Sequence, residues 1–228
     1  MKIFVAKMKC KYCDTKCHKK GKRNRRQQYQ CPVCYSYQKQ NYVRNSLKSY
    51  DTELLIKLNN EGLGIRSIGR VLNIPKSTVS KLIFTLSKEI KQPTLKESAE
   101  EYEVDELRTF IGKKENECWI CYAINRNTKE VIDFVVGRRT KSNLKKLIDS
   151  ILELEPKKIY TDKLNVYPNL IPKRIHSKAF IKTNHIERKN LTIRTHLKRL
   201  NRRTICFSKS LVMLNACLLL YFWVEIRT

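Results

Sequence analysis

The stretch "CWICYAINRNTKEVIDFVVGRR", residues 118–139, decides the fold of this chain. Two apolar runs flank the polar segment "NRNTK", and both runs contain β-branched and aromatic residues. This pattern predicts a β-hairpin of two strands. Cys118 and Cys121 lie three positions apart in the first strand, so alternation places them on opposite faces of the sheet. We therefore expect both cysteines in the core and not on a metal ion.

Strand-like and helical segments alternate on both sides of this hairpin. The further segments are a strand at 101–114 that runs into a turn, a helix at 140–155, a short strand at 156–162 in position to lie parallel to the first, another short strand at 174–180, and a basic helix at 184–203. This order predicts an α/β fold in which helices flank a mixed sheet.

The charge of the chain indicates the kind of partner it binds. Among 228 residues, 48 are Lys or Arg and 21 are Asp or Glu, which gives a formal net charge of +27. So large a positive charge repels itself unless the partner is a polyanion. We expect nucleic acid as that partner. An anionic membrane surface is the alternative, but no lipidation motif or polybasic amphipathic anchor stands out.

The most apolar segment is "LVMLNACLLLYFWVEI", residues 211–226. It contains Asn215 and Glu225 and is shorter than the roughly 20 apolar residues that a membrane span needs, so we expect a buried helix and no membrane association. The N-terminus lacks the apolar run of a signal peptide. We therefore expect a reducing cytoplasmic location, in which paired cysteines bind metal more often than they form disulfides. Cys206 and Cys217 are expected in the core.

Composition divides the chain into four parts. Dense Lys and Arg and five of the nine cysteines mark residues 1–45, and short helical patterns mark residues 46–92. Residues 93–100 are charged, begin with a proline and are expected to form a linker. The strand and helix pattern described above occupies residues 101–228.

Two C-x-x-C pairs stand near the N-terminus: Cys10 with Cys13, and Cys31 with Cys34. Seventeen residues separate the pairs, a spacing typical of a zinc site. Two such turns direct four sulfurs to one point, and a closed four-cysteine site is structural. Cys17 or His18 replacing one ligand, or four cysteines without metal, are the alternatives. The basic loop at 19–30 is expected to lie on a phosphate backbone, or else only to be solvated.

Residues 51–90 have the pattern of three short helices. Asp51 is suited to cap the first helix, and "NIP" at 73–75 forms a turn before the third. This is the pattern of a helix-turn-helix unit, whose last helix reads DNA with its N-terminal part. The expected DNA-binding residues there are Lys76, Ser77, Thr78, Ser80 and Lys81. A three-helix protein-interaction module is the alternative.

Three acidic residues of the predicted sheet domain are candidates for a catalytic metal site: Asp105, Asp162 and Glu187. Neighbouring strand ends converge, so Asp105 and Asp162 can meet, and Glu187 follows on the next helix. Carboxylates at one point require cations, and oxygen ligands suit Mg²⁺ or Mn²⁺, which promote in-line displacement at phosphorus. Spacing does not separate Asp105 from its acidic neighbours, Glu101, Glu103 and Glu106. Asp162 as a turn carboxylate and Glu187 as a surface ion-pair partner of Arg188 are the alternatives.

Several segments of this chain resemble the transposases of the insertion-sequence-one family. They are "CKYC" (10–13), "QQYQCPVC" (27–34), "VDELRTFIGKKENECWICYAINRNT" (104–128), "FVVGRRT" (134–140), "KKIYTDKLNVYPNLIP" (157–172) and "NHIERKNLTIRTHLKRLNRRTICFSKS" (184–210). The resemblance implies a zinc finger, a helix-turn-helix and an RNase H-like domain with an Asp-Asp-Glu triad. It implies that Asp105, Asp162 and Glu187 form this triad, flanked by Asn184 and Arg188.

The sequence departs from the family pattern at three positions. Lys163 and Leu164 stand where Gly-Trp usually follows the second aspartate, and Arg108 stands where Trp usually follows "DEL". An inactivated copy of a transposase is therefore an alternative to an active enzyme.

The function implied is cleavage and joining of DNA. The enzyme would bind the terminal repeats of its element, free 3′-hydroxyl ends and join them to target DNA, in the prokaryotic nucleoid and as at least a homodimer. The basic residues expected to hold phosphates are Arg188, Lys189, Arg194, Lys198, Arg199, Arg202 and Arg203. His185 and His196 are expected to pack or to contact phosphate. A non-catalytic DNA-binding repressor and an RNase H-like nuclease without joining activity are the alternatives.

Overall fold

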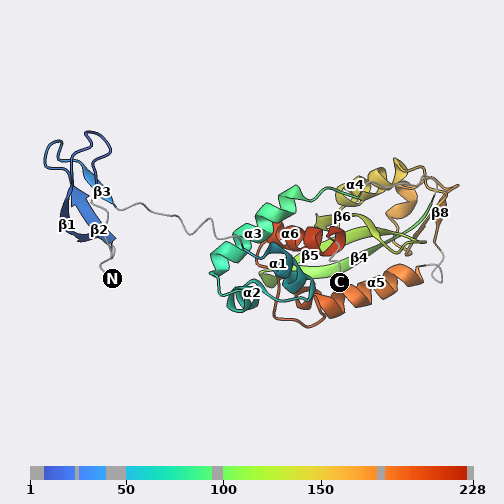
Figure 1. The fold of residues 1–228 in the computed structure, drawn as a ribbon. Coiled ribbons are helices and arrows are strands. Elements are labelled where there is room, and N and C mark those ends of the chain that lie inside the picture. The colour runs from blue at the N-terminus through green and yellow to red at the C-terminus, as the bar shows by residue number, and fades with distance from the viewer. Residues whose placement is uncertain (1–7, 24–25, 40–49, 94–99, 179–182, 225–228) are drawn as a thin grey trace. The chain divides into compact units, whose positions relative to one another are not determined.

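The computed structural model describes residues 8–23, 26–39, 50–93, 100–178 and 183–224. The chain forms two compact units, Met1–Tyr50 and Asp51–Thr228 (Figure 1). The expected linker at 93–100 lies within the second unit, and its residues 94–99 fall outside the described residues. Among the described residues, no helix is both long enough and apolar enough to cross a membrane.

The smaller unit is a three-stranded antiparallel sheet. Its strands are β1 (His18–Arg23), β2 (Arg26–Gln30) and β3 (Tyr37–Lys39), in the order β1-β2-β3. Its buried cluster comprises Cys10, Cys17, Tyr29 and Cys31, with Met8 packed against it. So small an apolar core cannot by itself hold a fold together, which makes an additional cross-link necessary.

The larger unit contains a five-stranded mixed sheet of strand order β6-β5-β4-β7-β8. Its strands are β4 (Glu101–Ile111), β5 (Lys113–Asn125), β6 (Val131–Gly137), β7 (Lys158–Thr161) and β8 (His176–Ser177). β5 and β6 are antiparallel, so the predicted hairpin is confirmed. β7 lies parallel to β4, also as predicted, because helix α4 (Lys141–Leu152) carries the chain across the sheet.

Each face of the sheet has its own apolar core. Helix α4 covers one face, and α5 (Asn184–His196) lies on the other (Figure 1). Cys121 belongs to the core on the α4 side and Cys118 to the core on the α5 side, so the prediction of two buried cysteines on opposite faces is confirmed. This mixed sheet with flanking helices fits an RNase H-like fold.

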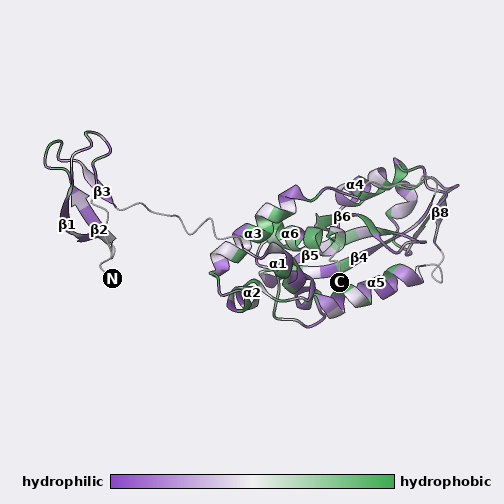
Figure 2. Ribbon diagram, viewed as in Figure 1, coloured by the Kyte–Doolittle hydropathy of each residue, from purple (hydrophilic) through white to green (hydrophobic). Residues whose placement is uncertain are grey.

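Helix α6 (Leu211–Trp223) is apolar on nearly all sides (Figure 2), as expected of a buried helix. Leu214 and Leu218 pack against the sheet. Cys217 and Leu220 instead join the core of three helices, α1 (Thr52–Asn60), α2 (Ile65–Val71) and α3 (Lys76–Glu89). Asp51 caps α1 as predicted, since its carboxylate accepts the N–H of Leu54 at 2.8 Å. The three helices and the sheet therefore share α6 as a common core element.

Two details of the sequence-based prediction are wrong. The basic helix predicted over 184–203 ends at His196, because Leu197 turns into an extended conformation that buries its side chain. A short 3₁₀ turn, η4 (Lys198–Leu200), follows. Cys206, expected in the core, is exposed, whereas Cys217 is buried as predicted.

Candidate active site and metal-ligand clusters

Strand β4 continues beyond the end of its neighbour β7, and this offset creates the acidic site. Val104 pairs with Thr161, the last residue of β7, so Asp162 leaves the sheet next to Asp105. One carboxylate oxygen from each of Asp105, Glu106 and Asp162 lies within 4.8 Å of the others. Asp105 and Asp162 therefore converge as predicted, and Glu106 joins them.

Asp105 is held by hydrogen bonds to both of its carboxylate oxygens. Oδ1 accepts the N–H of Glu106 at 2.7 Å, and Oδ2 accepts Nδ2 of Asn190 at 2.6 Å. Burial, and to a smaller extent the nearby carboxylates of Glu106 and Asp162, raise the pKa of Asp105 to about 6, although its two hydrogen bonds act in the opposite direction. Ionisation of Asp105 in this site therefore costs free energy, which a bound cation would offset.

Glu106 reaches the same point from the opposite face of β4. Its carboxylate accepts the hydroxyl of Tyr167 and Nη2 of Arg139, the latter at 3.2 Å. Burial raises the pKa of Glu106, while these two donors act in the opposite direction. Strand alternation alone would separate Glu106 from Asp105, which is why spacing could not assign it a place in the site.

Asp162 closes the turn that follows β7. Its Oδ1 accepts the N–H of Leu164 at 2.9 Å, and Leu164 packs against the core on the α4 side. Among the described residues other than glycine, a few have a positive φ, and Lys163 is not one of them. The turn therefore does not require the glycine that the family pattern has at this position.

Glu187 is exposed on α5 and is not part of the acidic group within the described portion of the chain. It precedes Asn190 by three residues, so the two side chains share one helix face. Glu187 lines a cavity of about 430 Å³, together with Asn190, Leu191, Arg194, Thr195, Asn201 and Arg202. Through Asn190, this cavity adjoins the side chain of Asp105.

Glu103, two residues before Asp105, anchors the start of α5. Its fully buried carboxylate accepts the N–H of Ile186 at 2.9 Å and lies 2.6 Å from Nδ1 of His185 and 3.3 Å from Nε of Arg126. Of the four acidic residues that spacing left as candidates for the metal site, Glu103 therefore has a structural role. His185 packs against it, and His196 contacts the hydroxyl of Tyr221 at 2.8 Å.

The four predicted zinc ligands, Cys10, Cys13, Cys31 and Cys34, converge within 4.8 Å. The two loops that carry them have the same backbone hydrogen bonds: Cys10 N–H to Thr15 O and Asp14 N–H to Cys10 O, and Cys31 N–H to Ser36 O and Tyr35 N–H to Cys31 O. Sulfur separations of 3.5, 3.3 and 3.8 Å join Cys10 to Cys34, Cys13 to Cys31 and Cys13 to Cys34. A tetrahedral zinc ion with Zn–S bonds of about 2.3 Å requires separations of about 3.8 Å, so the four sulfurs fit it.

Ser36 and Gln38, which the sequence pattern did not single out, favour the thiolate form at Cys10 and, for Ser36, also at Cys34. The hydroxyl of Ser36 lowers the pKa of Cys10 to about 5 and also lowers that of Cys34. Nε2 of Gln38 donates to the sulfur of Cys10 at 3.0 Å. Cys17 is buried but lies outside the group of four, and His18 is exposed on β1.

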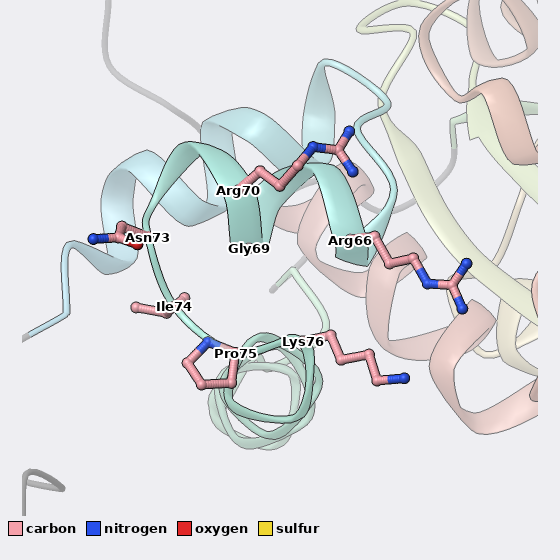
Figure 3. A pocket seen from close by; sticks show the side chains of 7 residues that line it. All are labelled: Arg66, Gly69, Arg70, Asn73, Ile74, Pro75 and Lys76. Atoms are coloured by element: carbon pink, nitrogen blue, oxygen red, sulfur yellow. The ribbon is translucent and has the colours of Figure 1, made fainter.

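The candidate DNA-reading residues lie at the start of α3. Lys76, Ser77 and Lys81 are exposed, and Thr78 and Ser80 are half-buried. A cavity of about 620 Å³ adjoins them, lined by Arg66, Gly69, Arg70, Asn73, Ile74, Pro75 and Lys76 (Figure 3). Arg66 and Arg70, both on α2, add positive charge that the sequence analysis had not assigned to this surface.

The other basic candidates differ in exposure. Asn184, Arg188, Lys198, Arg202 and Arg203 are exposed, and Lys189 and Arg194 are half-buried. Arg199 is buried, and its Nη1 lies 3.3 Å from Oγ of Ser208. Arg199 therefore packs in the interior and connects η4 to Ser208. The basic run of the sequence in which it stands does not predict this role.

Comparisons with known proteins identify the family of this chain. The insertion element iso-IS1n protein InsB of Shigella dysenteriae is 38% identical over 108 residues, which cover 47% of this chain and 82% of that protein. The IS1 protein InsB of Shigella flexneri is 34% identical, with the same coverage. The IS1 2 protein InsB of Escherichia coli K12 is also 34% identical, over 65% of its length. The family model described as IS1 transposase matches residues 101–226, more than half of the chain. The chain therefore belongs to the IS1 transposase family.

Proposed function

We propose that this chain is a DNA transposase that binds the ends of its insertion element, hydrolyses phosphodiesters to free 3′-hydroxyl ends and joins these ends to target DNA. The observation that carries the proposal is the convergence of Asp105 and Asp162 at the offset end of β7, in a chain of the IS1 transposase family. A repressor that only binds DNA has no need for this acidic site.

The donors at the site fit Mg²⁺ or Mn²⁺. All are carboxylate oxygens, the ligands that these ions prefer, and like charges this close cannot all stay ionised without cations. Asp105 and Asp162 would hold the metal, with Glu187 as the third acid of the triad. When bound, the ions would stabilise the charge on the attacking and leaving oxygens of an in-line displacement at phosphorus.

The residues of the chain itself would hold the DNA around this point. Arg194 and Arg202 line the cavity that Glu187 shares, so phosphates of the cleaved strand would be held beside the acids. The exposed start of α3, with Arg66 and Arg70 next to it, would bind the element ends. The four cysteines would hold a structural zinc ion, which would stabilise the smaller unit and its basic strands.

A cleavage assay on DNA that carries the element ends, with Mg²⁺ or Mn²⁺, tests the proposal. Asp162→Ala and Asp105→Asn should abolish strand cleavage and joining while the ends are still retained in a gel-shift assay. Asp149→Asn is the matched control, because this carboxylate lies on the surface of α4 in an ion pair with Lys145. Cleavage that persists in the Asp162→Ala and Asp105→Asn variants would refute the assignment of the site.

The joining of two element ends requires at least two active sites, so we propose a homo-oligomer on DNA. Light scattering of the chain with and without end DNA tests this point, and the smallest complex that cuts both ends should contain at least two copies.

A further inference from the structure

Asp105 and Tyr122 are direct cross-strand partners in the β4–β5 ladder, so both side chains lie on the α5 face of the sheet. Asn190 of α5 bridges them. The hydroxyl of Tyr122 donates to Oδ1 of Asn190 at 2.8 Å, and Nδ2 of Asn190 donates to Oδ2 of Asp105 at 2.6 Å. Three separate elements thus contribute one residue each to a continuous hydrogen-bonded chain.

The chemistry of the amide fixes its orientation. The carboxylate of Asp105 only accepts hydrogen bonds, so the NH₂ group of Asn190 must face it. The carbonyl oxygen of Asn190 then faces Tyr122, which supplies the proton that this oxygen requires. The carbonyl oxygen of Ile186, at 3.2 Å, is the more distant acceptor of the same hydroxyl.

Tyr122 is itself immobilised. Its side chain is fully buried, and its ring stacks on that of Phe222 with centroids 6.0 Å apart. Because the ring of Tyr122 is held in place, its hydroxyl holds the amide of Asn190 in one orientation. The amide in turn limits rotation of the Asp105 carboxylate. One donor at each carboxylate oxygen still leaves acceptor capacity for a cation.

We propose that Asn190 is a positioning residue that holds the carboxylate of Asp105 in the orientation that binds a divalent cation, and that Tyr122 holds Asn190 in place. This inference rests on the proposed function, because it requires that Asp105 binds metal. The same contact fixes the rotation of α5 about its axis, and with it the direction of Glu187 one turn earlier.

Mn²⁺ affinity of the full chain, measured by electron paramagnetic resonance without DNA, tests the inference. Partners that orient a metal ligand typically change metal affinity about 10–100-fold when removed. We expect Asn190→Ala to weaken Mn²⁺ binding by about this factor, and Tyr122→Phe to weaken it about three- to tenfold. The Mn²⁺ concentration that half-activates cleavage should rise in parallel, so that excess Mn²⁺ restores the activity of Tyr122→Phe.

Two control variants separate positioning from general packing. Tyr221→Phe removes another tyrosine hydroxyl, which contacts His196, and Thr192→Ala removes a hydroxyl that contacts the α5 backbone. Both should keep the Mn²⁺ affinity of the unaltered chain. Unchanged affinity in Asn190→Ala and Tyr122→Phe, with affinity lost in Asp105→Asn, would overturn this inference alone. An unaltered chain that binds no Mn²⁺ would overturn the proposed function and this inference with it.

Discussion

Gly62, in the turn between α1 and α2, lies against the carbonyl oxygen of His196, the last residue of α5. A Cβ atom at Gly62 would approach this oxygen to 1.9 Å, and the φ of Gly62 is +75°. The end of the helix that carries Glu187 is thus in backbone contact with the three-helix unit proposed to bind DNA. Only glycine satisfies both the conformation and the close approach.

Gly62→Ala should destabilise the larger unit by about 3 kcal/mol or more, because a left-handed alanine costs about 1–2 kcal/mol and the overlap with His196 forces the backbones apart. Chemical denaturation of the full chain measures this loss. Gly112→Ala is the matched control, since Gly112 also has a positive φ, +76°, but a Cβ added there would meet no atom within 4 Å. It should cost only about 1–2 kcal/mol. If both variants lose the same stability, the close approach of Gly62 to His196 does not contribute to the effect of Gly62→Ala.

Zinc should hold the smaller unit together. Cys31→Ser removes one of the four sulfurs, so the chain should lose its zinc, and the environment of the buried Tyr29 should become that of an unfolded segment. Cys17→Ser changes a cysteine of similar burial that lies outside the group and should retain one zinc ion per chain. Zinc content by atomic absorption and hydrogen exchange of residues 8–39 measure both effects. Zinc retained by Cys31→Ser and lost by Cys17→Ser would reassign the ligands.

Glu103 should be essential for the attachment of α5 to the sheet. Glu103→Gln replaces a buried carboxylate that meets three donors, so about 2–3 kcal/mol of stability should be lost. Amide exchange at the start of α5 should accelerate, and cleavage should fall while end binding persists.

Glu101→Gln is the matched control for Glu103→Gln. Glu101 also pairs with Arg126, at 3.2 Å, but its side chain is 40% exposed. Exposed ion pairs contribute little, so the loss should stay below about 1 kcal/mol. If both variants lose the same stability, burial of the Glu103 carboxylate is not the reason for its effect.

The strands and a meeting of acids from β4 and the end of β7 could be predicted because they depend on local patterns, whereas the choice of Asp105 among its acidic neighbours rested on the resemblance to the family. The alternation of residues 118–124 places Cys118 and Cys121 on opposite faces in any sheet. A parallel β4–β7 pair brings the residue that follows β7 beside β4, and the register of the pair places it next to Asp105. These expectations required no knowledge of side-chain contacts.

The remaining features depend on contacts between distant segments. Glu106 enters the site because β7 stops at Thr161, so that Asp162 leaves the sheet beside β4 and lies near carboxylates from both of its faces. No glycine or proline follows His196 to indicate the end of α5 in the sequence. The helix ends there because Leu197 and Leu200 are buried. Asn190 appears in the sequence as one polar residue of a basic helix, and only its neighbours in space give it a role.

The pKa of Asp105 predicts a distinctive dependence of stability on pH. This pKa, raised from 3.8 to about 6 by burial, means that the folded chain binds a proton more tightly than the unfolded chain. Well below pH 3.8 the carboxyl group is protonated in both states and contributes its full stability. That contribution is lost as the pH rises through 6, because ionisation then favours the unfolded chain.

Asp105→Asn removes this ionisation, so in the absence of metal it should make the folded chain more stable at pH 7.5. The rise in pKa corresponds to at most about 3 kcal/mol, and screening by solvent at a partly exposed site reduces the expected gain to about 1–2 kcal/mol. At pH 5 the gain should be smaller by about 1 kcal/mol, because most of the folded Asp105 is then already protonated. Urea denaturation at the two pH values measures the difference, and Asp149→Asn, on the surface of α4, is the control for the loss of a carboxylate outside the site. A variant that is less stable than the unaltered chain at pH 7.5 would show that the hydrogen bonds of Asp105 outweigh the cost of burying its charge.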